Sequence, residues 1–390
     1  PSPPPLCPIG FNGELPNMDL LNTAVHHLGR HGAAISLDTC SVPLHRSNSS
    51  CPDAFAKAGR VVLDAVSRRG VGGFMDKYLR HLFSMLGFVG SLAVGPSGPH
   101  AHFLRHSVDA ITIVGLGAQE KQLKRPAVHA RDVLSAVLNL VRSISNTEEE
   151  LHHSFFCYIM LSTKTFVSIG EYAYALGLLL LPLAVQASKL VSPKPSISLQ
   201  HAVLVVGCLE AFGLLIFGAA VTAPELPAST LTLLLYGVTA VGYLLVAVML
   251  WASRESGRTQ AWEGPKAAAA CLLLYVLIVT ALLNWSLALI VTLTHVPVLV
   301  IVRPLHPRTP QFWAMLVVLG AATPPCLLWL LGIMTGYGNG HTVLLRWLRG
   351  YMMSGLMNLP MVCLVSIPVH LMGVYVLFSL QWPKVSTPAC

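Results

Sequence analysis

The chain has 390 residues, of which 54% are hydrophobic and only 11% are charged. Soluble domains carry roughly 25% charged residues, so this chain, with a mean hydropathy of +0.64, is expected to be an integral membrane protein. The composition excludes a disordered chain, a coiled coil and collagen, and nine cysteines are too few for a disulfide-rich secreted scaffold. The net charge of +8 does not predict nucleic-acid binding, because much of the excess lies in short segments between apolar runs.

Charge is distributed unevenly along the chain. Residues 1–164 hold 15 of the 25 Lys and Arg and 12 of the 17 Asp and Glu, so this part is expected to face water. Residues 165–390 hold the remainder and are expected to be mostly membrane spans. Because the chain begins at Pro1 rather than Met, we expect a fragment whose earlier segments are missing.

The water-facing part shows helical and strand patterns in alternation. Apolar spacing predicts helices over residues 53–66, 74–86 and 133–144. Between the last two, the β-branched stretch 107–115 predicts a buried strand. A helix–strand–helix order is typical of the closing part of an α/β domain, which we assign to residues 1–150.

A further helix is predicted at the approach to the membrane. Thr147 with Glu150 three residues later matches a capping box, so a membrane-entry helix is expected over residues 151–164. It carries aromatic residues where an interfacial belt would lie: Phe155, Phe156 and Tyr158.

Six apolar runs follow, and a membrane-spanning helix needs roughly 20 residues. They cover residues 165–190, 200–222, 229–252, 267–302, 311–335 and 352–380. The fourth is too long for one comfortable span and is interrupted by Asn284 and Pro297. As two short helices it gives seven spans, and as one it gives six. Seven spans place eight of the ten Lys and Arg of this part on one side, which favours that count.

The charges also predict orientation. The bundle, residues 165–380, is expected to end in a cytoplasmic tail, residues 381–390. Lys189 and Lys194 follow the first span, so the positive-inside rule places the water-facing part on the non-cytoplasmic side.

That compartment permits two covalent modifications. Asn48 stands in an Asn-Ser-Ser sequence and is a candidate glycosylation site. Cys40 and Cys51 are candidates for a disulfide, although two free thiols fit the spacing equally well.

Sixteen histidines raise the question of a metal site. Adjacent pairs, such as His26-His27 and His152-His153, point about 100° apart on a helix and seldom bind one ion. His100 has a better context, because the segment from His100 through Phe103 into the expected strand resembles co-catalytic zinc aminopeptidases. The other ligands of those enzymes lie upstream of this chain, and a catalytic zinc usually needs three. We therefore expect a vestigial ligand position, with no metal, cofactor or catalytic residue.

The membrane part contains acids and prolines. Glu171 lies near the outer end of the first span and Glu210 near the middle of the second, where an acid by default suggests function. Protonated acids that bind a neighbouring helix are the alternative. Prolines predict kinks that can open a groove for a lipid or a partner helix: Pro182, Pro297, Pro324, Pro325, Pro360 and Pro368.

Three segments resemble the GPI-anchor attachment (GAA) subunit of the glycosylphosphatidylinositol (GPI) transamidase complex. They are GFNGELPNMDLLN (Gly10 to Asn22), PHAHFLRHSVDAITIVG (Pro99 to Gly115) and the stretch from LHHSFFCYIM to FVSIGEY (Leu151 to Tyr172). They occur in order and at fitting spacing, and the number and hydropathy of the later spans agree.

The resemblance implies both a fold and a location. The fold is a lumenal α/β domain, the C-terminal part of a zinc-aminopeptidase-like fold, followed by an all-α multi-span bundle in the endoplasmic reticulum membrane. By this comparison the chain is N-terminally truncated, since it lacks the family's first span and the first half of the lumenal domain.

The resemblance also implies a function. The family recognises GPI and presents it for attachment to the C-terminus of proproteins, whereas a cysteine-protease-like subunit supplies the nucleophile. The expected partners are the other transamidase subunits, the GPI lipid and the C-terminal signal of the proprotein. Such a lipid needs a groove with polar groups near the lumenal interface. We expect groove residues at Asn284, Trp285, Ser286 and Pro368, and phosphate contacts at Arg346 and Arg349.

Two other functional classes remain open. A membrane-bound zinc metallopeptidase, or an amide-forming metalloenzyme, would need the upstream ligands. A multi-span transporter would use Glu210 as a coupling site and would normally show internal repeats, which the sequence lacks.

Overall fold

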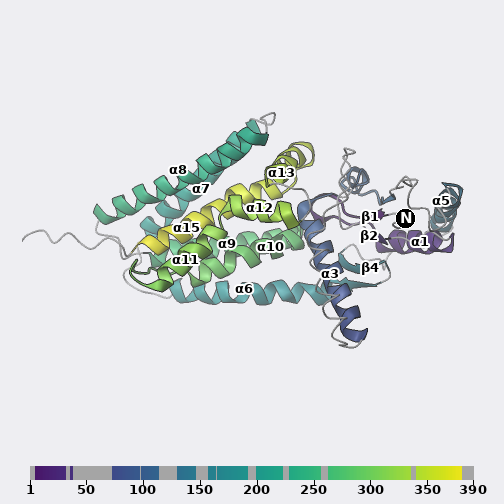
Figure 1. The fold of residues 1–390 in the computed structure, drawn as a ribbon, viewed down its shortest axis with the longest axis horizontal. Coiled ribbons are helices and arrows are strands. Elements are labelled where there is room, and N and C mark those ends of the chain that lie inside the picture. The colour runs from purple at the N-terminus through teal and green to yellow at the C-terminus, as the bar shows by residue number, and fades with distance from the viewer. Residues whose placement is uncertain are drawn as a thin grey trace, which may run out of the picture. The chain divides into compact units, whose positions relative to one another are not determined.

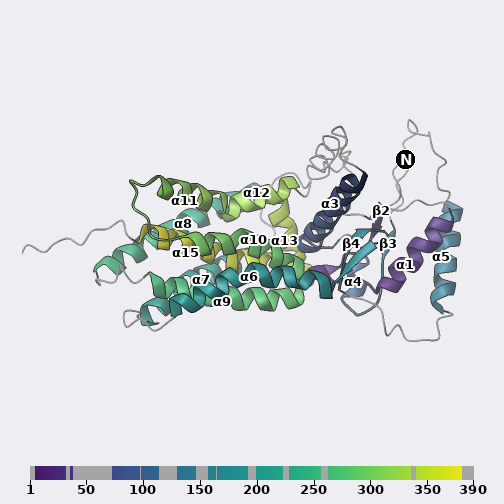
Figure 2. The same ribbon diagram turned by 90° about the horizontal axis from the view of Figure 1, so that it is seen from below.

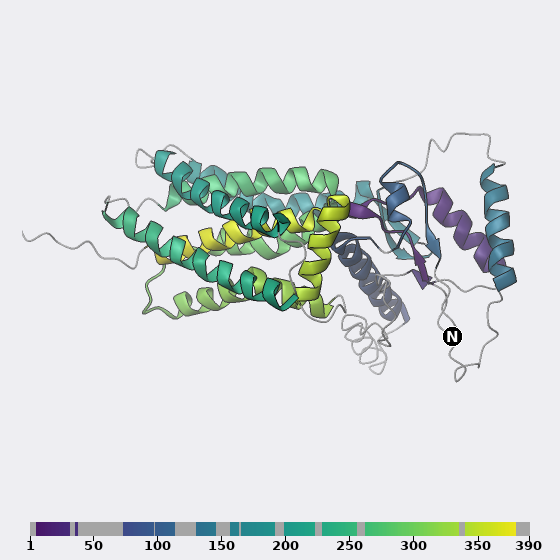
Figure 3. The ribbon, with the colours of Figure 1, turned by 90° about the horizontal axis from the view of Figure 1, so that it is seen from above.

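The chain is mostly helical and divides into two compact units, Pro1–Ala173 and Tyr174–Cys390 (Figures 1–3). The computed structural model describes residues 5–31, 36–37, 73–96, 98–113, 130–145, 157–163, 165–191, 199–222, 228–255, 262–334 and 340–379. Asn48, Cys40, Cys51, the helix expected over 53–66, the capping box at Thr147 and the tail lie outside these ranges.

A small sheet lies at the centre of the first unit. Its strands are β1 (Pro5–Cys7), β2 (Ser36–Leu37) and β3 (Thr112–Ile113), in the order β2-β1-β3. The central strand pairs parallel with β2 and antiparallel with β3. Its side chains at Leu6 and Cys7 are fully buried, as expected of a strand with neighbours on both edges.

The first unit also contains helices. They are α1 (Met18–Arg30), α3 (Gly73–Val94), α4 (Ala101–Leu104) and α5 (Ala130–Ser145), and a short 3-10 turn, Phe11–Gly13, precedes α1. The helices expected over 74–86 and 133–144 are confirmed as parts of α3 and α5. Figure 2 shows α1 and α5 side by side, and Leu28 packs against Ala136 between them.

The strand expected over residues 107–115 is much shorter than predicted. Within the described part of that range, only Thr112 and Ile113 pair as β3, and both are half-buried. Val108 is exposed, and Ser107 has a positive φ of 58°. The β-branched composition indicated a strand correctly, but this segment forms an edge of the sheet and joins it only at Thr112.

The prediction of a membrane-entry helix over residues 151–164 is wrong for the part of this range that the structure describes. Residues 158–168 instead form a hairpin of β4 (Tyr158–Ser162) and β5 (Thr165–Ser168). β-Branched and aromatic residues on both strands, among them Ile159, Phe166 and Val167, favour this arrangement. Tyr158 is accordingly not an interfacial residue: it is 1% exposed, and its hydroxyl donates to the Pro16 carbonyl at 2.9 Å.

The second unit is a bundle of long helices. They are α6 (Ile169–Val191, which starts in the first unit), α7 (Leu199–Thr222), α8 (Ala228–Glu255), α9 (Glu263–Leu283), α10 (Trp285–Ile301), α11 (Pro310–Ala321), α12 (Pro324–Met334), α13 (Gly340–Ser354), α14 (Asn358–Met361) and α15 (Ile367–Phe378). Helices α14 and α15 are joined by a π-helical segment, Val362–Ser366, and form one continuous last helix. In Figure 3, α13 crosses the bundle at a steep angle to the other helices.

Cross-helix contacts define the two ends of the bundle. At the end where α14 begins, the Thr280 hydroxyl of α9 lies 3.7 Å from the Met361 sulfur. At the end where α15 terminates, Gln186 of α6 donates to the Val300 carbonyl of α10 at 2.8 Å. We call these the α14 end and the α15 end.

Several helices are suited to crossing a membrane. Among the described residues, five are long and apolar enough: α6, α7, Tyr236–Ser253 of α8, α9 and the last helix. The pair α11–α12, bent by 60°, makes a sixth if it counts as one span. The 17 residues of α10 fall short of the usual length. The all-α bundle expected from the apolar runs is therefore present.

The long apolar run 267–302 is divided at Asn284 into α9 and α10. Asn284 accepts from the Leu287 amide at 3.0 Å and so caps α10. Helix α10 returns towards the α15 end, so Arg303 lies at that end, as do Lys189 of α6 and Lys266 of α9. Arg346 and Arg349 lie on α13, at the α14 end.

Replacing Tyr158 with Phe is expected to destabilise the first unit. The variant leaves the buried Pro16 carbonyl without its donor, which costs about 1–3 kcal/mol. Burial and the nearby Asp109 carboxylate raise the pKa of Tyr158, so the hydroxyl stays protonated and donates across the working pH range. Thermal unfolding of the full chain should show a lower Tm for Tyr158→Phe. The matched change at Tyr174, which is 74% exposed, should leave the Tm unchanged. Equal Tm values for both variants would contradict a stabilising hydrogen bond from Tyr158 to Pro16.

Candidate functional site

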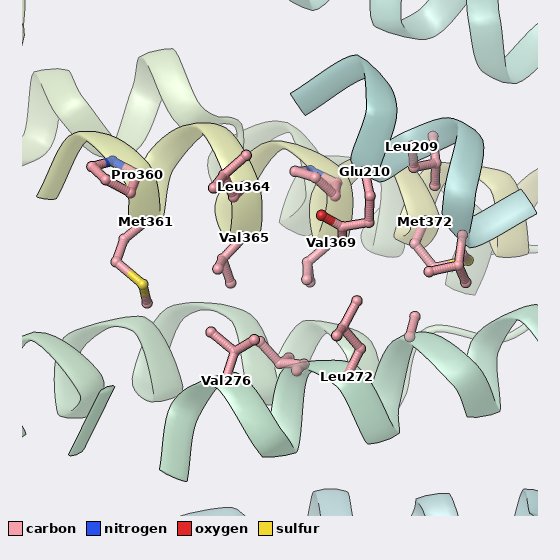
Figure 4. A pocket seen from close by; sticks show the side chains of 14 residues that line it. Leu209, Glu210, Leu272, Val276, Pro360, Met361, Leu364, Val365, Val369 and Met372 are labelled. Atoms are coloured by element: carbon pink, nitrogen blue, oxygen red, sulfur yellow. The ribbon is translucent and has the colours of Figure 1, made fainter. Parts of the chain in front are cut away.

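A cavity of about 290 Å³ lies between α7, α9 and the last helix (Figure 4). This volume is near the lower end of the range of about 300–1,000 Å³ typical of small-molecule pockets. Its lining comes from Val206, Leu209 and Glu210 of α7, Ala269, Leu272, Leu273 and Val276 of α9, and Pro360, Met361, Leu364, Val365, Pro368, Val369 and Met372 of the last helix. All but Glu210 are apolar, so the cavity suits a hydrocarbon ligand. We call it the groove.

The backbone of the last helix is irregular beside the groove. The π segment ends two residues before Pro368, which has no N–H to donate to the preceding turn. π-helical turns are rare and occur frequently at functional sites. The kink expected at Pro368 therefore takes the form of a locally widened helix.

A glycine on α7 lies against this irregular segment. A Cβ on Gly213 would lie 2.5 Å from the Cys363 carbonyl oxygen and 3.2 Å from Cγ of Pro368. Glycine is therefore needed for α7 to approach the last helix this closely. The contact fixes one wall of the groove.

Glu210 is the one ionisable side chain among the residues that line the groove. It lies near the middle of α7, and Figure 4 shows its side chain extending from α7 towards α15, with the carboxyl group near Val369. A carboxylate in an apolar, membrane-embedded setting is costly unless it is neutral or paired. At this position the acid is suited to a neutral form that can donate one hydrogen bond to a ligand.

The site residues predicted from the sequence are only partly brought together. Pro368 lines the groove. Asn284 and Ser286 are 3% exposed and belong to the α9–α10 turn at the α14 end; neither they nor Trp285 line the groove.

The two predicted phosphate contacts lie on α13. Arg349 is exposed and Arg346 is half-buried, and the helix lies at the α14 end of the bundle. Pro368 follows the start of α14 by ten residues, a rise of about 15 Å along the helix. The charged pair and the groove proline are therefore at different depths.

Sequence reasoning missed most of the groove. Its walls at Leu209, Ala269 and Val276 are ordinary apolar helix residues, and no local pattern distinguishes them from lipid-facing ones. Gly213 was also missed. This glycine carries no local signal, because its close contact is made to Cys363, 150 positions later.

His100 is held as a structural residue. It is 3% exposed, and its Nδ1 lies 2.8 Å from the Thr112 hydroxyl of β3. Burial lowers the pKa of His100, and the backbone at Pro8 and Ile9 partly offsets this effect. Among the residues that the structure describes, no group of three or more His, Cys, Asp or Glu is placed to hold a metal ion.

The three segments that resemble the GAA subunit meet in the first unit. Tyr158 of the third donates to Pro16 of the first. The Asn17 amide of the first donates to Asp109 of the second at 2.9 Å. Phe11 packs edge-on against His102 of the second, with ring centroids 5.1 Å apart. Their spacing in the sequence therefore reflects one packed cluster.

Comparison with known protein families agrees with this geometry. The model of a family described as Gaa1-like, GPI transamidase component, matches residues 6–374 of the chain. The chain belongs to this family. The match takes in the packed cluster of the first unit and nearly all of the bundle. The chain is thus a GPI transamidase component and, with its several spans, a multi-pass membrane protein.

The burial of His100 predicts a pH dependence of stability. Its pKa is lowered in the folded state, so as the pH falls through the ordinary value of 6.5 the unfolded chain binds the proton first. The stability contributed by neutral His100 is therefore complete above pH 6.5 and is lost below it. Thermal unfolding at pH 7.5 and 5.5 should show a smaller drop in Tm for His100→Gln than for the wild type. An unchanged drop would show that another group controls this pH range.

Proposed function

We propose that this chain is a non-catalytic subunit of the GPI transamidase that binds the GPI lipid within the membrane and presents it for attachment to proproteins. The groove beside the last helix is the observation that carries the proposal. It is apolar, it lies between helices suited to crossing a membrane, and its one polar group is an acid in the middle of a span.

The ligand has two chemically different parts, and the chain offers a region for each. An acyl tail is pure hydrocarbon and suits the apolar walls around Leu272 and Val365. The glycan–phosphate head needs a polar, water-accessible region. The α14 end supplies this with Arg346 and Arg349 on α13, and arginine binds phosphate oxygens in a bidentate manner.

The α9–α10 turn has a supporting role in this proposal. Asn284 and Ser286 are buried and shape the α14 end, and Trp285 begins α10 there. We place these residues beneath the head group rather than against the acyl tail.

The first unit is proposed to lie in the lumen of the endoplasmic reticulum as a partial zinc-aminopeptidase-like domain. The charge distribution supports this orientation, since Lys189, Lys266 and Arg303 share the α15 end. The nucleophile would then belong to a cysteine-protease-like partner subunit, and the proprotein's C-terminal signal would be the second substrate.

Changing the shape of the groove is expected to reduce lipid binding. Gly213→Leu pushes α7 away from Cys363, and Ala269→Leu adds bulk to the opposite wall without touching that contact. GPI recovered with the affinity-purified complex should fall roughly tenfold, the change that a loss of about 1.4 kcal/mol in binding produces.

A glycine on the same helix provides the control. Gly207 has no atom within 4 Å of an added Cβ, so Gly207→Leu should retain GPI. If Ala269→Leu leaves the complex assembled and its GPI content unchanged, the groove is not the lipid site.

The head-group contact is tested separately. Replacing both Arg346 and Arg349 with Ala should lower GPI co-purification and make the remaining binding less sensitive to salt, because two cations that attract phosphate are removed. The single change at Arg308, which is exposed at the α15 end, should have no such effect. Unchanged GPI recovery in the double variant would exclude these arginines.

A further inference from the structure

A group of buried polar atoms lies inside the bundle, away from the groove. Thr292 and His295 of α10 and His370 of α15 are each at most 4% exposed. The Thr292 hydroxyl, Nε2 of His295 and Nδ1 of His370 make no hydrogen bond within the described residues. An unsatisfied polar atom costs several kcal/mol in a membrane interior, where no bulk water can reach it.

Helix register brings these atoms to one place. Thr292 and His295 are three residues apart and share a face of α10. Helices α10 and α15 run in the same direction, and a Cβ on Gly373 would lie 3.9 Å from Val298. His370 lies three residues before Gly373, and His295 lies three residues before Val298. The two histidines therefore occupy the same level of the interface.

The remaining contacts fix how each histidine presents its free nitrogen. Nδ1 of His295 lies 2.7 Å from the Thr294 hydroxyl, which itself donates to a backbone carbonyl, and 3.2 Å from the Val291 carbonyl. Both oxygens are left to accept, so this nitrogen carries the proton and Nε2 is an acceptor. Nε2 of His370 pairs with the Tyr243 hydroxyl of α8 at 3.0 Å. If that hydroxyl donates, Nδ1 of His370 is a donor. The α10–α15 interface then holds one acceptor, one donor and the Thr292 hydroxyl, which is both.

We propose that a single water molecule binds between α10 and α15, bridging His295, His370 and Thr292. A buried water typically makes about three hydrogen bonds to otherwise unsatisfied polar groups, which is the number available here. The water donates to Nε2 of His295, accepts from Nδ1 of His370 and bonds the Thr292 hydroxyl.

A metal ion is the less suitable occupant of this site. Two neutral imidazoles and one hydroxyl supply no negative charge, and a zinc ion usually has at least three His, Cys or carboxylate ligands. A dication here would be an uncompensated charge inside the membrane.

The water site positions the last helix. His370 faces α10 and α8, whereas its neighbours Val369 and Pro368 line the groove on another side of the same helix. The bridge through Tyr243, His370, the water and His295 thus ties three helices together behind the groove wall. It does not depend on what occupies the groove.

A double-mutant cycle on the full chain in mild detergent tests this site. His295→Phe and His370→Phe should each lower the Tm, because each leaves the water and the opposite imidazole with an unpaired group. The double variant should lose clearly less than the sum of the two, because both unpaired groups are gone. Additive losses would overturn the proposal.

The control pair combines His295→Phe with His201→Phe. His201 is also buried but bonds Tyr375 at 3.1 Å, at the α15 end of the bundle, so its loss should add to that of His295→Phe.

A second measurement keeps the test decisive if a variant fails to fold. A density map of the wild-type chain that resolves ordered water should show one peak within roughly 2.7–3.2 Å of both nitrogens. Direct contact between the two rings without a peak would overturn the proposal. So would a stoichiometric transition metal found by elemental analysis of the purified protein.

Discussion

The burial of the last helix is the constraint on which the bundle depends. Of its most apolar stretch, 83% is buried, whereas the other four long spans are 22–39% buried and so can face lipid. A helix that is apolar on all sides is typical of such a central position. It contacts α7, α8, α9, α10 and α11. Because protein surrounds it, its irregular π segment need not expose unpaired carbonyls to hydrocarbon. The groove therefore lies on one side of the last helix, and the buried histidines lie on another.

Close packing around that helix relies on small residues and polar contacts rather than on apolar burial alone. Within a membrane, lipid tails compete with apolar side chains, so helix association depends on tight fit and hydrogen bonds. Gly213 and Gly242 allow α7 and α8 to approach the last helix, and its own Gly373 allows α11 to do so. Tyr375 adds a polar contact to His201. The groove lies where the last helix faces α7 and α9.

The sequence predicts the parts of this architecture that are encoded locally. The length of the apolar runs predicted the spans, and Asn284 predicted the break between α9 and α10. Glu210 was recognised as an unusual acid. Each of these signals is visible within one window of sequence. The hairpin at Tyr158 was missed because a capping signal upstream favoured a helix, whereas its burial depends on Pro16, 142 residues away. The groove was missed for the same reason. Its three walls come from segments that are distant in sequence, and nothing local marks which face of each helix turns inward.

The α9–α10 pair is closed at both ends by its own residues. Asn284 caps the turn at one end, and at the other the Lys266 ammonium group donates to the Val300 and Val302 carbonyls that end α10. Lys266 is 2% exposed, so its charge is satisfied by this helix terminus and by the Trp262 ring 5.8 Å away. Most of the polar contacts at these two ends thus come from the pair itself, and Gln186 of α6 adds one more donor to Val300. The pair consequently has the properties of a helical hairpin whose two ends are held together by its own side chains.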